Sequence, residues 1–127
     1  MASLIDPTLN GKPLRDLDFS FDYVSTPAYQ EMLGASIVLT RTHRPFKVIR
    51  DAEGDLGSLR TLIINNAMVM SEFEEERVRA FVRDGGTLVA SGLTSLQRPD
   101  GSSSGDFALA DVFGVSYSGS LSRRVNY

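Results

Sequence analysis

A G-x-S-x-G string at residues 101–105 is the part of this sequence that most directly suggests nucleophilic catalysis. In a nucleophile elbow the central serine, here Ser103, stands on a sharp strand-to-helix turn with a histidine base within reach. The surrounding residues are mostly Ser, Gly and Pro, which is typical of a surface loop. The single histidine, His43, precedes the serine, whereas the hydrolase order places it after the nucleophile. We therefore interpret the string as loop composition and predict no catalytic residue.

The other charged or polar clusters also have structural explanations. His43 is predicted just past a helix C-terminus, where an imidazolium interacts favourably with free carbonyl groups. Basic residues between 41 and 50 could hold a phosphate or an acidic partner, but the acidic residues between 51 and 55 largely cancel their field. The segment 51–55 resembles a calcium loop only faintly, since its glycine is at the fourth position instead of the sixth. The acidic run 72–76 is explained by its place at a helix start.

Composition excludes several classes of function. The chain has 127 residues, no cysteine and one histidine, so disulfides, cysteine nucleophiles and almost every zinc or iron site are excluded, and we expect one domain without a cofactor or metal. A net charge of −3 argues against nucleic-acid binding. The longest apolar runs are far shorter than the roughly 20 residues that span a bilayer, so we expect no membrane segment. The first residues lack the features of a signal peptide, and we expect a cytoplasmic protein.

The clearest local signal is the start of a helix. Ser71 and Glu74 have the spacing of a capping box, and the apolar stripe of Val78, Phe81 and Val82 carries the helix to the glycines at 85 and 86. Apolar runs predict buried strands at residues 59–65 and 87–90, and a shorter one at 45–49. Residues 25–27 are typical of a helix start, and helical spacing continues to about residue 41.

These elements predict an α/β domain with a small open, mostly parallel sheet and helices on both faces. Alternation over residues 18–24 predicts a further strand, residues 97–106 a loop, 107–113 a short helix, and 115–127 a final strand and a tail. Because Pro and Gly interrupt residues 1–16, we predict a tail or linker there, with the α/β domain over 17–119 and a C-terminal tail over 120–127.

Open parallel sheets bind ligands beyond the carboxyl ends of their strands. A small molecule would therefore contact the short polar residues and glycine that follow the predicted strands. The same residue types also form turns and helix caps, so a purely structural role stays open. This candidate pocket consists of Ser25, Thr26, Asn65, Asn66, Ser91, Gly92 and Thr94.

Two segments taken together, DGGTLV at residues 84–89 and ADVFGV at residues 110–115, carry a family resemblance. With the segment 62–66 and the helix that follows it, they make the chain similar, over about residues 23–119, to the trimerisation domain of beta-galactosidases of glycoside hydrolase family forty-two and related glycosyl hydrolases. The resemblance implies a class I glutamine-amidotransferase-like, flavodoxin-like fold that holds subunits together beside a catalytic barrel. The family's domain continues past the end of this sequence, so the fold is expected to be truncated here.

No activity follows from this resemblance. Amidotransferases of this fold use a cysteine that the chain lacks, and the family's hydrolytic glutamates belong to the barrel. We expect a non-catalytic, homo-oligomeric association domain, because a sheet without its last strands exposes an edge and an apolar helix face that a second copy would cover. Two alternatives stay open: a small-molecule or sugar-binding module at the polar strand ends, and a glycoside hydrolase fragment completed by a separate barrel. The expected association surface consists of Phe19, Phe21, Tyr23, Phe113, Val115 and Tyr117.

Overall fold

The computed structural model describes residues 2–5, 27–49, 54–103 and 105–119. They form a sheet of four strands in the order β2-β1-β3-β4, and every neighbouring pair is parallel. The strands are β1 (Ala2–Ile5), β2 (Phe46–Ile49), β3 (Thr61–Asn65) and β4 (Thr87–Ser91), and the helices are α1 (Pro27–Arg41), α2 (Glu72–Arg83) and α3 (Ala110–Phe113). The prediction of a small open parallel sheet with helices is confirmed.

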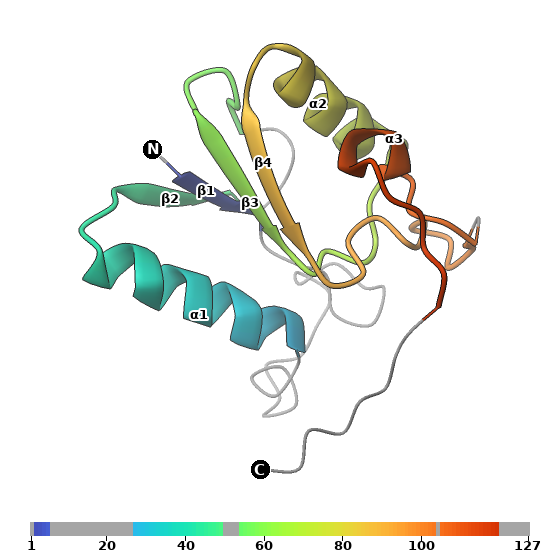
Figure 1. Cartoon of the computed structure of the whole chain (residues 1–127), viewed down its shortest axis with the longest axis horizontal. Coiled ribbons are helices and arrows are strands. Elements are labelled where there is room, and N and C mark those ends of the chain that lie inside the picture. Colours follow the sequence, from blue (N-terminus) through green and yellow to red (C-terminus); the bar gives the residue numbers. More distant parts are fainter. Residues whose placement is uncertain (1, 6–26, 50–53, 104, 120–127) are drawn as a thin grey trace.

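The connections place helices on both sides of the sheet. The chain moves from the central β1 to β2 through α1, and in the opposite direction from β3 to β4 through α2. Because such crossovers are right-handed, the two helices lie on opposite faces. Figure 1 shows α1 on one side of the sheet, and α2 and α3 on the other.

The main core lies between the sheet and α2. Leu62 and Ile64, on one face of β3, have no exposed surface, and they pack with Val78 and Phe81 of α2 and with Leu109 before α3. Continuous apolar residues in β3 thus produce the buried central strand that the sequence predicts. On the other face, α1 contributes only the buried Ala28, and Leu33, Ile37 and Val38 are exposed.

Two helix ends follow the sequence prediction closely. At α2 the Glu74 amide donates to the Ser71 hydroxyl at 3.3 Å, and the Ser71 amide donates to the Glu74 carboxylate at 2.8 Å, which completes the capping box. At α3 the chain stops at Gly114, whose φ of 69° is the left-handed C-terminal conformation.

Two predictions about the chain ends need correction. The tail predicted over residues 1–16 is wrong for Ala2–Ile5, because these residues form β1 in the middle of the sheet, in register with β2 and β3. No strand is present over residues 115–119, where the final strand was expected to begin, and α3 starts at residue 110 and not at 107. The strand predicted at 18–24 and the tail at 120–127 lie outside the described residues.

Candidate functional site

A groove of about 440 Å³ runs beside β4, between the edge of the sheet and α3. Leu88 and Ala90 of β4 form one wall, and Val112, Phe113 and Val115 form the other. The remaining lining residues are Val82, Ser91, Gly92, Thr94 and Phe107, so none of the residues that line the groove is charged. An open, uncharged groove that combines apolar side chains with a few short polar ones is of a kind that can hold another molecule.

The strand beside this groove is itself unusually open. Val89 is 49% exposed and Ala90 is also exposed, whereas the neighbouring β3 is largely buried. β4 pairs only with β3 among the described strands, so its outer edge carries backbone groups without a ladder partner there.

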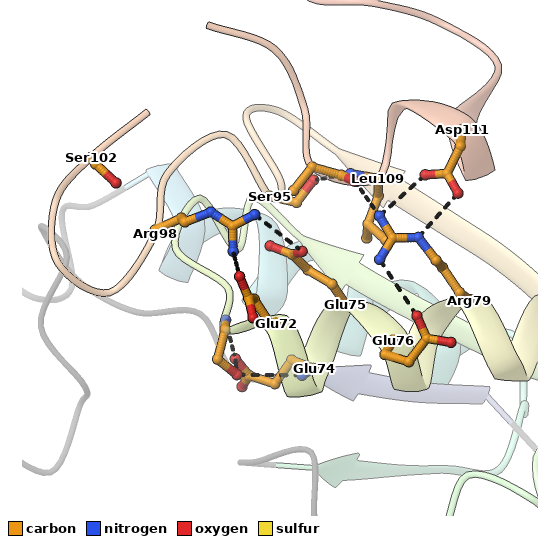
Figure 2. Close-up of polar contacts among 12 residues, drawn as sticks. Glu72, Glu74, Glu75, Glu76, Arg79, Ser95, Arg98, Ser102, Leu109 and Asp111 are labelled. Atoms are coloured by element: carbon orange, nitrogen blue, oxygen red, sulfur yellow. Dashed lines mark hydrogen bonds and ion pairs between the residues drawn. The ribbon is translucent and has the colours of Figure 1, made fainter. Parts of the chain in front are cut away.

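Figure 2 shows how α3 is held against α2 and the loop after β4. Leu109 is fully buried, and its backbone N–H donates to the Ser95 hydroxyl at 3.2 Å. The Arg79 guanidinium, on α2, donates to the Asp111 carboxylate at 3.0 Å and also to the Ala108 carbonyl. This hydrogen bond from Arg79 lowers the pKa of Asp111. These contacts fix the outer wall of the groove.

An aromatic cluster supports the same wall. The Phe107 ring meets those of Phe113 and Tyr117 edge to face, with centroids 5.8 and 5.5 Å apart. The Asp106 carboxylate accepts from the amides of Phe107 at 2.7 Å and Tyr117 at 2.6 Å, and the bond from Tyr117 is the main reason that the pKa of Asp106 is lowered. Asp106 therefore joins the residues before and after α3.

The structure brings together half of the predicted association surface. Phe113 and Val115 line the groove, and Tyr117 packs beside it on Phe107. Val115 is 59% exposed, although it is a large apolar residue. Phe19, Phe21 and Tyr23 lie outside the described residues, so their part of the prediction stays a prediction. Ser91, Gly92 and Thr94 of the predicted ligand pocket also line the groove, whereas Leu88 and Ala90 of β4 belong to neither predicted set.

The acidic start of α2 contacts the loop after β4 (Figure 2). Glu72 forms an ion pair with Arg98 at 3.0 Å, and the buried Glu75 lies 3.9 Å from the same guanidinium. Burial raises the pKa of Glu75, while the positive charges of Arg98 and Arg79 act against this shift and Glu72 and Glu74 add to it. The Glu75 Oε1 atom has no hydrogen-bond partner. The carboxylates of the acidic run thus hold the loop as well as the helix start.

The polar ends of β3 and β4 are neighbours, as the candidate ligand pocket requires, since Asn65 and Ser91 are paired in the sheet register. Local hydrogen bonds already occupy much of this cluster. The Asn66 side chain accepts from the Leu93 amide at 2.8 Å, and the Thr94 hydroxyl donates to the Ser91 carbonyl at 2.7 Å.

Gly92, at a φ of 61°, lies so close to the Asn66 side chain that a Cβ atom would collide with it. These bonds and this contact are those of a turn. Ligand binding at this cluster stays a prediction.

Two further observations concern these polar residues. Glu31 of α1 accepts a hydrogen bond from the Ser91 hydroxyl. The periodicity of the helix sequence did not predict this contact. The Asn65 Nδ2 group is buried without a hydrogen-bond partner. Ser25 and Thr26 lie outside the described residues.

The serine string and the histidine lie apart from each other. Ser103 is exposed in the loop after β4 and donates to the Leu96 carbonyl at 3.0 Å, and Ser104 is outside the described residues. His43 is exposed in the turn after α1, where its amide donates to the Thr40 carbonyl at 3.1 Å. His43 thus lies just past a helix C-terminus, as the sequence predicts.

Within the described ranges, no group of three or more His, Asp or Glu side chains is placed to hold a metal ion. None of the helices found there combines the length and the apolar character that crossing a membrane requires.

Comparison with known proteins identifies a similar fold. No protein-family model matches the sequence, and no curated protein does either. The crystal structure of beta-galactosidase from Bifidobacterium adolescentis superposes with a TM-score of 0.71 over 91% of this chain, at 12% sequence identity. The match spans 53% of that beta-galactosidase chain, so this sequence corresponds to about half of its length. At this identity the finding concerns the fold: the chain folds like part of a beta-galactosidase.

Proposed function

We propose that this chain is a non-catalytic association domain that forms homo-oligomers through the groove beside β4. The observation that carries the proposal is the uncharged groove itself, which joins an open sheet edge to exposed apolar residues of β4 and the α3 segment. Burying the apolar part of this surface would stabilise an assembly at roughly 25 cal/mol per Å², before the entropy and desolvation costs of association are subtracted.

The fold comparison supports a relationship to glycosidases. The matched protein is a beta-galactosidase, and the segments DGGTLV and ADVFGV resemble the trimerisation domain of that class of enzymes. The observed strand order also agrees with the first four strands of a flavodoxin-like sheet. We extend the proposal to an association role beside a glycoside hydrolase catalytic barrel. In this role the chain itself catalyses no reaction.

Sedimentation velocity between about 1 and 100 µM tests the proposal, because a Kd of about 10 µM corresponds to roughly −7 kcal/mol and falls in that range. We expect the wild type to self-associate and Val115→Asp to be monomeric, since the new carboxylate would have to be buried in an apolar interface. Val38→Asp is the matched control, because Val38 is 60% exposed on α1 and Val115 is 59% exposed.

A wild type that stays monomeric over the whole range contradicts the proposal. So does a Val115→Asp variant that associates as strongly as Val38→Asp does.

A further inference from the structure

A second cavity, of about 200 Å³, lies between α2 and the segment that leads into β3. Its apolar lining includes Leu56, Leu59 and Phe81, which also belong to the hydrophobic core. Two charged residues line it as well, Arg77 of α2 and Asp84 directly after that helix. None of its lining residues is shared with the groove beside β4, so this cavity is a separate candidate site.

The Arg77 guanidinium is held in place but has no carboxylate partner among the described residues. Its Nη2 atom donates to the Gly54 carbonyl at 2.6 Å, and its Cζ atom lies 5.8 Å from the centre of the Phe73 ring. The other two arginines of α2, Arg79 and Arg83, both form ion pairs with carboxylates. The Nε and Nη1 donors of Arg77 therefore remain for a ligand, and a guanidinium in a fixed orientation can bind a carboxylate through two parallel hydrogen bonds.

The other end of the cavity is negative. Asp84 is the C-cap of α2, and within the described ranges its carboxylate has neither a hydrogen-bond nor an ion-pair partner. The helix C-terminus adds a partial negative charge at the same end. Arg83 lies in the last turn of α2, but it pairs with Glu76 and does not line the cavity. A cation is therefore favoured beside Asp84, as a carboxylate is beside Arg77.

The spacing of the two charged residues sets the length of an occupant. Arg77 and Asp84 are seven positions apart, which corresponds to about 10.5 Å along a helix axis. A charge-assisted hydrogen bond of about 2.8 Å at each end leaves roughly 5 Å between the charged groups of the occupant. An α-amino acid attaches both of its charged groups to one carbon atom, so it is too short. The cavity is also smaller than the roughly 300–1,000 Å³ of sites for drug-sized ligands.

We infer that this cavity binds a small zwitterion in which an apolar chain separates a carboxylate from an ammonium group. The carboxylate accepts from Arg77, the ammonium group donates to Asp84, and the apolar chain lies on Leu56, Leu59 and Phe81. This site does not depend on the proposed function, because the groove beside β4 contains none of these residues.

NMR chemical-shift titration of the backbone amides with ε-aminocaproate tests the inference. We expect shifts at the residues that line the cavity, with a Kd in the millimolar range because so small a ligand makes few contacts. Hexanoate, which lacks the ammonium group, should bind about threefold more weakly, since exposed ion pairs contribute little. Hexylamine, which lacks the carboxylate, should bind about tenfold more weakly, because it cannot accept from the guanidinium.

Two variants assign the ends of the ligand. Arg77→Gln should weaken the binding of ε-aminocaproate about tenfold. Arg83→Gln is the matched control, because it removes the same charge from the same helix at a residue that does not line the cavity. Asp84→Asn keeps the size of the side chain and should abolish the difference between ε-aminocaproate and hexanoate. Circular dichroism melting of each variant checks that it is folded.

The outcomes separate this inference from the proposed function. Equal effects of Arg77→Gln and Arg83→Gln overturn the site, and so does the absence of shifts at the cavity with tens of millimolar ε-aminocaproate. Hexanoate that binds the wild type as tightly as ε-aminocaproate overturns the role of Asp84 and the zwitterion. A wild type that is monomeric in sedimentation but binds ε-aminocaproate as described overturns the proposed function and supports this inference.

Discussion

Leu109→Ala is the substitution that most directly tests how the outer wall of the groove is held. Leu109 is fully buried and belongs to the core cluster that joins α2, β3 and the α3 segment. Leu→Ala changes at buried sites destabilise proteins by about 2.7–5 kcal/mol, and we expect about 3 kcal/mol here. With an unfolding entropy of about 2.1 cal/mol/K per residue over 127 residues, that loss lowers the melting temperature by roughly 11 °C.

The assay is thermal unfolding followed by circular dichroism at a concentration where the wild type is monomeric. Leu33→Ala serves as the control, because Leu33 is 40% exposed on α1 and its truncation should lower the melting temperature by only a few degrees. Sedimentation should in addition show weaker self-association of Leu109→Ala at temperatures where it is folded. Equal melting temperatures for the two variants would refute the packing of α3 on the core.

Three further predictions concern α2 and the turn after β4. Because burial raises the pKa of Glu75 in the folded state, the wild type should gain stability relative to Glu75→Gln as the pH falls through that raised pKa toward 4.5, the ordinary value for a glutamate. Urea titrations at several pH values would measure this gain, and a stability difference between the two proteins that does not change with pH would contradict it. Gly92→Ala should destabilise the fold by about 1–3 kcal/mol through its left-handed backbone and its contact with Asn66, whereas Gly34→Ala, in an open helix position, should stabilise it by up to about 1 kcal/mol; both are measurable by chemical denaturation. Ser71→Ala should cost about 1 kcal/mol in the same assay by removing the capping box, and an unchanged midpoint would contradict that role.

Local sequence signals were sufficient for the elements that have a recognisable helix cap or a continuous apolar run. The capping box at Ser71, the left-handed Gly114 and the apolar run of β3 each act within a few residues, and each predicted its element. β1 was missed because Ala2–Ile5 is only four residues long and includes the polar Ser3, and so short a segment does not distinguish a strand from other structure. Its stability comes from pairing on both sides with strands far along the chain.

The candidate site was predictable only in part, for the same reason. Phe113 and Val115 could be selected as apolar residues near an exposed segment, but the opposite wall is formed by Leu88 and Ala90, which read in the sequence as residues of a buried strand. Whether a strand lies at the edge of a sheet depends on the order of all strands. The use of Asn66 as a turn acceptor for Leu93 likewise depends on a contact across 27 positions.

The central position of β1 has a consequence for how the chain reaches its native state. β2 touches the rest of the sheet only through β1 among the described strands, and Ala2 is paired with Thr61, a residue 59 positions later. Closing so large a loop is slow because its entropy is lost before the contacts form. During synthesis β1 must therefore wait until β3 has been made before it can be inserted between β2 and β3. Removing Ala2–Ile5 would leave β2 detached from β3 and β4.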